Sequence, residues 1–178
     1  MSLRKLCSVL LFALFSLLCL LPSSVAFAAD NEVTRASLRG LNSIRVVMDY
    51  LNPEILREGF NSDQIQAEVE LQLQSAGVKI LADERLPFLM ICPLITKFSK
   101  NNYTYFVRME FYQLVVPYQF LSQKTDKETP SYFESALFAT TWTSPGVMGT
   151  AQNLADIKRR ISDEVAKFIA AFEAANPR

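Results

Sequence analysis

The feature that most constrains the fold of this chain is a pair of apolar segments on either side of a short polar turn. Residues 88–98 are strongly apolar, and residues 103–112 alternate so that aromatic and aliphatic side chains share one side of an extended strand. Asn101 and Asn102 lie between them, and asparagine tolerates the positive φ of a tight turn. The two segments therefore predict an antiparallel hairpin. The residues that share one side of its second strand are Tyr103, Tyr105, Val107, Met109 and Phe111.

Shorter segments extend this hairpin into a mixed sheet. Residues 44–50 alternate in the same way, and residues 136–143 are rich in β-branched and aromatic side chains. A helix is predicted over residues 61–76, closed by Gly77, and a short strand over residues 78–81 follows it. A strand, a helix and a strand in this succession favour a right-handed crossover with parallel pairing.

A second long helix is predicted over residues 154–172, where apolar residues recur every three or four positions. Pro145, Gly146 and Gly149 precede it and predict a plain turn from strand to helix. The element order along the chain is therefore β-α-β-β-β-β-α. We predict the α+β fold class, with a mixed four- to five-stranded sheet and two helices packed on one of its faces.

The first thirty residues differ in kind from the rest. Arg4 and Lys5 precede a nearly unbroken apolar run from residue 6 to residue 21, and Ala26-Phe27-Ala28 places small residues where a signal peptidase reads them. The run is shorter than the roughly 20 residues of a spanning helix, which favours a cleaved leader over a retained transmembrane anchor. We predict a signal peptide over residues 1–28, a flexible lead-in over residues 29–41 and a single domain over residues 42–178.

Removal of the leader changes the cysteine count and the charge of the chain. Cys7 and Cys19 leave with it, so that Cys92 alone remains and no intramolecular disulfide is possible. Lipid attachment at Cys19 is the weaker alternative, because two leucines precede it where a lipidation site needs a small residue. The 18 basic and 18 acidic residues become 16 and 18 once Arg4 and Lys5 are lost, a net charge of −2. This charge argues against a nucleic-acid partner, and loss of the leader argues against stable membrane insertion.

The chain contains no histidine. Catalytic arrangements that use a histidine base and metal sites that use histidine ligands are therefore excluded. Cys92 lies in an apolar run, and we interpret it as a small buried hydrophobe rather than a reactive thiol. No pair of carboxylates is spaced for acid–base chemistry. We predict no catalytic residue, no cofactor and no metal site.

Aromatic side chains gather in the second half of the chain. Packing in the core explains most of them, and the remainder would form a strip on the solvent side of the sheet. Exposed apolar patches commonly mark sites of protein contact. The residues that we predict for partner contact are Phe106, Tyr112, Phe138 and Trp142.

Several stretches resemble a group of uncharacterised secreted bacterial proteins. They are Leu38-Arg39-Gly40-Leu41, residues 66–78, Thr141-Trp142 ahead of a glycine-rich turn, and Asn176-Pro177 at the end of the last helix. This resemblance implies export and fold, and it implies no activity. The element order also looks like small envelope modules such as the TolB amino-terminal domain and the lipoprotein activators of peptidoglycan synthases, which act by binding other proteins.

These observations predict a non-catalytic periplasmic or extracellular module that binds another envelope protein. The first alternative is a carrier or sensor of a hydrophobic small molecule. The second is an enzyme that works without histidine. The sequence carries no signal for an oligomeric state.

Overall fold

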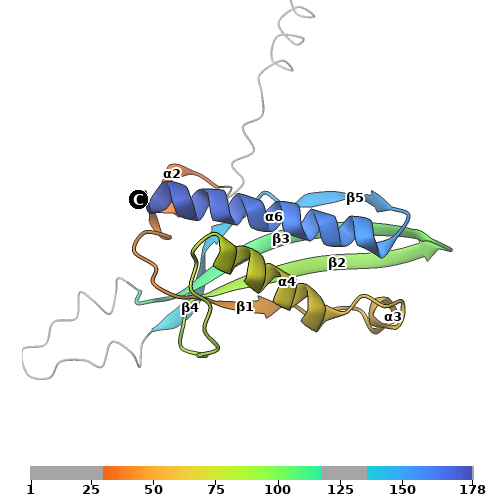
Figure 1. Ribbon diagram of the computed structural model, residues 1–178, viewed down its shortest axis with the longest axis horizontal. Helices are drawn as coiled ribbons and strands as arrows, with labels where there is room; N and C mark the ends of the chain where they lie inside the picture. The colour runs from red at the N-terminus through yellow and green to blue at the C-terminus, as the bar shows by residue number, and fades with distance from the viewer. Residues whose placement is uncertain (1–29, 118–135, 178) are drawn as a thin grey trace, which may run out of the picture.

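A computed structural model describes residues 30–117 and 136–177 of the chain, and these residues form one five-stranded sheet and four helices (Figure 1). The helices are α2 (Glu32–Ala36), α3 (Pro53–Arg57), α4 (Ser62–Ser75) and α6 (Leu154–Ala175). The strands are β1 (Arg45–Met48), β2 (Phe88–Ser99), β3 (Asn102–Val115), β4 (Leu137–Thr143) and β5 (Val147–Ala151). The predicted α+β class with a mixed sheet is confirmed.

The central strand of the sheet is β3, and every other pairing is arranged around it. On one side β3 pairs antiparallel with β2, from Phe88 opposite Tyr112 to the turn at Asn101, where φ is 58°. On its other side β3 pairs antiparallel with β4 near its end and with β5 near its start. The edge strand β1 runs parallel to β2. The predicted hairpin is therefore confirmed as the middle of the sheet.

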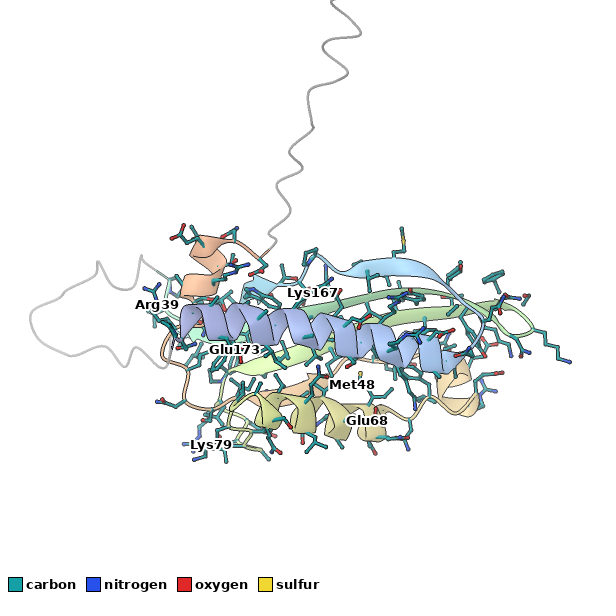
Figure 2. The ribbon with its side chains drawn as sticks, turned by 45° about the horizontal axis from the view of Figure 1, so that its top comes forward. Arg39, Met48, Glu68, Lys79, Lys167 and Glu173 are labelled. Carbon is teal, nitrogen blue, oxygen red and sulfur yellow. The ribbon has the colours of Figure 1, made fainter. Side chains whose placement is uncertain are left out.

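The helices α4 and α6 lie side by side over one face of the sheet (Figure 1). Met48 of β1 points to this face and lies between the two helices in Figure 2. The periodic apolar residues of both helices are buried in one core with the sheet, as the helical spacing predicts. They are Ile65, Val69 and Leu73 on α4, and Ile157, Ile161, Val165 and Phe168 on α6.

One charged side chain belongs to this helix layer. Glu164 of α6 is fully buried and forms an ion pair with Lys167, whose side chain is 47% exposed. The second carboxylate oxygen of Glu164 has no hydrogen-bond partner in the described part of the chain. The attraction between Lys167 and Glu164 offsets part of the free-energy cost of removing the carboxylate of Glu164 from water.

The segment predicted as a short strand over residues 78–81 is not a strand. It meets the sheet only at Ile80, which forms a single parallel bridge with Ile44. Just beyond Leu81 the side chain of Asp83 accepts a hydrogen bond from the backbone N–H of Arg85, and this turn carries the chain away from β1. The parallel partner of β1 is therefore β2 rather than residues 78–81.

The predicted turn before α6 is wrong over half of its length, because residues 147–151 form β5. Pro145 and Gly146 connect β4 to β5, with φ of 76° at Gly146, and the chain bends into α6 at Gln152 and Asn153. A Cβ at Gly146 would lie 2.8 Å from a ring carbon of Phe106, so a glycine is needed where the chain passes this ring. The long β3 leaves Tyr103–Val107 without a partner beyond β4, and β5 pairs with that segment.

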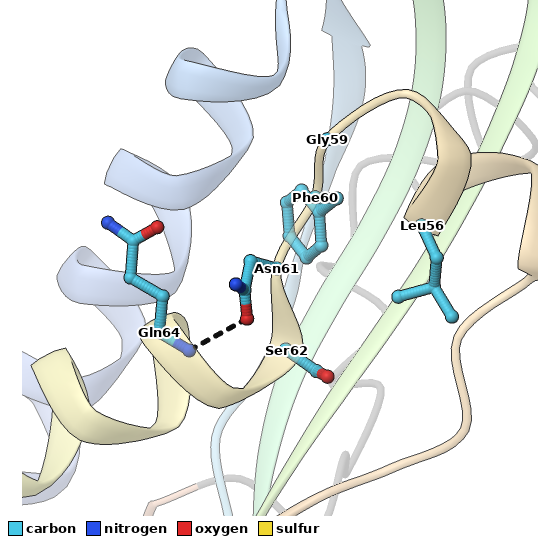
Figure 3. Close-up of a pocket in the computed structure, with 6 residues that line it drawn as sticks. All are labelled: Leu56, Gly59, Phe60, Asn61, Ser62 and Gln64. Atoms are coloured by element: carbon cyan, nitrogen blue, oxygen red, sulfur yellow. Dashed lines mark hydrogen bonds between the residues drawn. The ribbon is translucent and has the colours of Figure 1, made fainter.

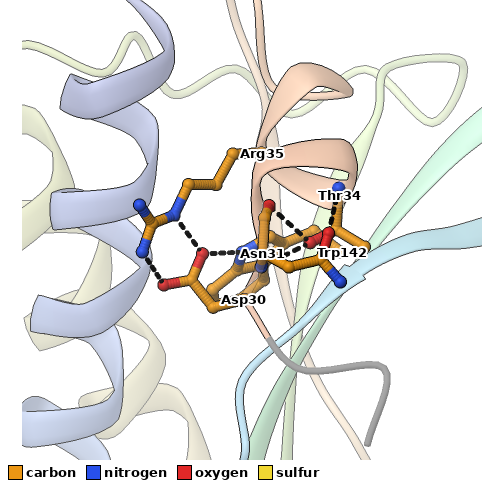
Figure 4. A network of polar contacts seen from close by, with 5 residues as sticks. All are labelled: Asp30, Asn31, Thr34, Arg35 and Trp142. Carbon is orange, nitrogen blue, oxygen red and sulfur yellow. Dashed lines mark hydrogen bonds and ion pairs between the residues drawn. The ribbon is translucent and has the colours of Figure 1, made fainter. Parts of the chain in front are cut away.

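The segment predicted as a flexible lead-in contains the helix α2. Asn31 caps α2 by accepting a hydrogen bond from the N–H of Thr34 (Figure 4). The carboxylate of Asp30 accepts two hydrogen bonds of 2.6 Å from Arg35 and one of 3.1 Å from the indole N–H of Trp142. Residues 30–35 are thereby fixed to β4.

The beginning and the end of the described chain also meet each other. The side-chain amide of Asn176, just past α6, donates a 2.9 Å hydrogen bond to the carbonyl of Leu38. Its oxygen accepts a 2.7 Å hydrogen bond from the N–H of Gly40. Leu38 is fully buried, so this part of the predicted lead-in belongs to the core.

The contacts of Asp30 generate a prediction about stability and its pH dependence. Asp30→Ala removes the acceptor of the buried Trp142 N–H, and because the ion pair with Arg35 is partly screened by solvent we expect a loss of only about 1 kcal/mol in unfolding free energy. The Arg35 hydrogen bonds lower the pKa of Asp30 although burial opposes them. A lowered pKa means that this stabilisation is complete at neutral pH and is lost as the pH falls through the folded-state pKa.

Urea unfolding at pH 7 and at several pH values below 4 measures both effects. Asp83→Ala is the matched control, since Asp83 also pairs with a nearby arginine but lies in an exposed loop away from the core. Equal midpoints for both variants and the unmodified chain at pH 7 would contradict a structural role for Asp30.

Candidate functional site

The face of the sheet opposite α4 and α6 is covered by none of the described helices, and we call it the open face. Side chains alternate along each strand, so the neighbours of core residues point to this face. It carries both apolar and charged groups. Its residues include Arg45, Val47, Phe88, Met90, Cys92, Leu94, Phe106, Arg108, Glu110, Tyr112, Leu114, Phe138 and Met148.

Four of these residues form a continuous stack, which we call the aromatic cluster: Arg45, Phe88, Tyr112 and Phe138. The rings of Phe88 and Tyr112 are cross-strand partners and lie parallel, with centroids 4.8 Å apart and an interplanar angle of 5°. Phe138 meets Phe88 edge-on at 5.3 Å. The guanidinium of Arg45 lies over the Phe88 ring from the other neighbouring strand, 4.5 Å from its centroid. The strands β1, β2, β3 and β4 thus each contribute one residue to the aromatic cluster.

Arg45 carries a charge that the described residues do not neutralise. No carboxylate of residues 30–117 or 136–177 forms an ion pair with it, and its Nε is buried without a hydrogen-bond partner. Stacking on Phe88 holds the planar group in place by a cation–π contact. The guanidinium is therefore held over the ring of Phe88 without an ion-pair partner among the described residues.

The remaining charges of the open face neutralise one another. Arg108 forms a 2.5 Å ion pair with Glu110, and the hydroxyl of Tyr112 donates a 2.6 Å hydrogen bond to the same carboxylate. The hydrogen bond to Glu110 raises the pKa of Tyr112. Burial raises the pKa of the Cys92 thiol to about 12, and the nearby carboxylates of Glu110 and Asp49 add to the effect. Cys92 is therefore a neutral, half-buried thiol on this face.

The structure brings together two of the four residues predicted for partner contact. Tyr112 and Phe138 belong to the aromatic cluster. Phe106 also lies on the open face, but it is paired with Met148 of β5 at a different place along β3. Trp142 does not lie on the solvent side at all.

The placement of Trp142 on the solvent-side strip is wrong, because the residue is 1% exposed. Its indole packs edge-on against Phe168 of α6 at 5.2 Å. The cause is a bulge in β4: Tyr112 pairs with Thr140, whereas Phe111 pairs with Trp142, so Thr141 is an extra residue. One extra residue turns every following side chain to the opposite face.

A cavity of about 460 Å³ lies between α3 and α4, and it does not form an apolar binding site (Figure 3). Asn61 caps α4 there by accepting a 3.0 Å hydrogen bond from the N–H of Gln64, and Phe60 is fully buried beneath. The lining consists mainly of polar groups, which does not suit a hydrophobic molecule. Its residues are Leu56, Gly59, Phe60, Asn61, Ser62 and Gln64.

Nowhere in residues 30–117 and 136–177 do three or more cysteine or carboxylate side chains gather as they would around a metal ion. None of the helices in the same ranges combines the length and the apolar character that crossing a membrane requires.

Comparison with known proteins identifies no family. No protein-family model matches the sequence, and no curated protein matches it. Among solved structures, the chain is similar to a dodecamer of a PelC point variant from Paraburkholderia phytofirmans, with 12% identity over 74% of this chain and 86% of that chain and a TM-score of 0.39. It is also similar to a minor lipoprotein from Acinetobacter baumannii, with 10% identity over 76% of this chain and 93% of that chain and a TM-score of 0.36. At these values neither protein identifies a function for this chain.

The environment of Cys92 predicts a thiol of low reactivity. Because its pKa is raised to about 12, only a very small fraction is thiolate at pH 8, and alkylation by iodoacetamide should be slower than that of an unfolded control by at least about tenfold. Mass spectrometry of timed samples measures the rate in buffer and in urea. Equal rates in the two solvents would show that Cys92 is an accessible, ordinary thiol.

Proposed function

We propose that this protein is a non-catalytic exported module that binds another envelope protein through the aromatic cluster of its open face. The observation that supports the proposal is the stack of Arg45, Phe88, Tyr112 and Phe138 on a sheet face that no described helix covers. Export rests on the leader predicted over residues 1–28.

The composition of the cluster matches that of protein-binding hot spots. Such hot spots are enriched in aromatic side chains and arginine, which offer a large contact area with few rotamers to immobilise. Phe138 is 38% exposed, and Leu114, its partner on β3, is 42% exposed. Burying these side chains would supply hydrophobic free energy, and a carboxylate of the partner would pair with Arg45.

The other two candidate functions find less support in the site. A carrier of a hydrophobic molecule needs an enclosed apolar cavity, and the cavities beside Asn61 and beside Asn102 have mainly polar linings. A histidine-free enzyme needs an activated nucleophile or base. Cys92 is deactivated by its raised pKa, and the carboxylate of Glu110 is occupied by Arg108 and Tyr112.

The proposal predicts that Phe138→Ala weakens partner capture. We expect roughly tenfold less partner to be recovered after crosslinking in intact cells and affinity purification, because loss of a hot-spot aromatic ring removes more than about 1 kcal/mol of binding free energy. The captured proteins are identified and quantified by mass spectrometry. Arg45→Ala should reduce recovery of the same partner, since it removes the cation of the cluster.

Phe98→Ala is the matched control, because Phe98 is also an exposed phenylalanine, at the far end of the hairpin from the cluster. Circular dichroism of each variant checks that the fold is intact. If a captured partner is retained equally by Phe138→Ala, Arg45→Ala and Phe98→Ala, the aromatic cluster is not its binding site.

A further inference from the structure

The strand β5 forms an open edge of the sheet. Among the described strands it pairs with β3 alone, and its far side meets no other described element (Figure 1). The edge at β4 differs, because Ser37 donates a 3.3 Å hydrogen bond to the carbonyl of Thr141 there. The edge at β1 is partly occupied, because Ile44, next to β1, forms a parallel bridge with Ile80. The backbone of β5 is thus the part of the sheet perimeter where added pairing is least obstructed.

The direction of the free backbone groups follows from the pairing of β3. The N–H of Ser144 donates a 2.9 Å hydrogen bond to the carbonyl of Met109, so the odd-numbered residues of β3 direct their backbone groups toward β4 and β5. The β5 partners of odd-numbered β3 residues are Val147, Gly149 and Ala151. The N–H and C=O groups of the two residues between them therefore point away from the sheet. Those residues are Met148 and Thr150.

We propose that β5 pairs antiparallel with β5 of a second copy of this chain, with a two-fold axis at Gly149. In this register Met148 of each copy lies opposite Thr150 of the other, and each pair exchanges two hydrogen bonds. Each outward-directed N–H or C=O group of β5 in one copy is thus hydrogen-bonded to a group of β5 in the other copy. Gly149 of one copy lies opposite Gly149 of the other copy across the axis. The two form a non-hydrogen-bonded pair with Cα atoms ~4.5 Å apart.

The side chains of β5 favour this contact. The strand contains no charged residue and no proline, which are the usual means of protecting an edge from pairing. Met148 is 81% exposed on the open face, where it lies beside Phe106, and Leu94 on the other side of Phe106 is 68% exposed. Pairing would cover part of this apolar row with Thr150 and Met148 of the second copy.

The helix layer leaves room for the second copy. The helix α6 lies over β3 and β5, so the two copies of α6 would be separated by two to three strand spacings, or about 10–14 Å. Packed helices lie about 8–10 Å apart, so the two α6 helices would not collide. Five residues of edge bury less area than a permanent dimer needs, and we expect association that depends on protein concentration.

The substitution Thr150→Pro should prevent pairing with a second copy while leaving the fold of the single chain intact. The N–H of Thr150 points outward, so proline at this position removes no hydrogen bond within the chain but removes one in each half of the dimer. We expect sedimentation velocity of the purified exported protein to show a mass that rises with concentration, and we expect Thr150→Pro to remain monomeric. Thr150→Val keeps the N–H and should associate like the unmodified chain.

Disulfide crosslinking tests the register without a proline. In a Cys92→Ala background, chains with Met148→Cys and chains with Thr150→Cys should crosslink when mixed and oxidised, since hydrogen-bonded partners lie ~5.5 Å apart. Either chain alone should crosslink far less, because the two copies of the same position lie about 8 Å apart, beyond disulfide reach.

A monomeric mass for the unmodified chain at all concentrations would refute the proposal. So would undiminished association of Thr150→Pro, or crosslinking that is no stronger in the mixture than in the separate chains. The aromatic cluster is intact in all of these variants, so partner capture by Thr150→Pro reports on the proposed function separately.

Discussion

The antiparallel pairing of β2 with β3 is the interaction on which the rest of the structure depends. Its register is regular from Phe88 opposite Tyr112 to Lys97 opposite Tyr103, and over this length it fixes which side chains face the helices and which face away. The core side accepts α4 and α6, and the open side is left with a mixture of rings and charges. The free side of β3 is long enough for two short strands in succession. Core, open face and edge are therefore consequences of a single hairpin.

Much of the architecture was predictable because it depends on local patterns. Alternation identified the hairpin, and helical spacing identified α4 and α6, since both patterns result directly from burial on one side. β5 was missed because Pro145, Gly146 and Gly149 are typical turn residues. Its existence depends on the difference in length between β3 and β4, which leaves half of β3 to be paired. That is a property of the sheet and not of residues 147–151 themselves.

The candidate site was harder to predict than the fold, since it depends on pairing between strands. Tyr112 and Phe138 were placed correctly on the open face, whereas Trp142 was not. The bulge at Thr141 cannot be recognised from the sequence pattern of residues 136–143. Phe88 was missed although the hairpin register places it opposite Tyr112. Arg45 was missed because its contact with Phe88 requires the parallel pairing of β1 with β2.

The contacts of Asn176 bring the two ends of the described chain to the same place. Its amide bonds both Leu38 and Gly40, so the start of the domain and the end of α6 are already joined without a covalent link. The connectivity of the sheet does not require the chain to begin and end there. A circular permutant that links this junction and opens the chain at an exposed turn elsewhere would retain the same topology of pairing, which makes the fold a candidate for insertion into a host protein at a single loop.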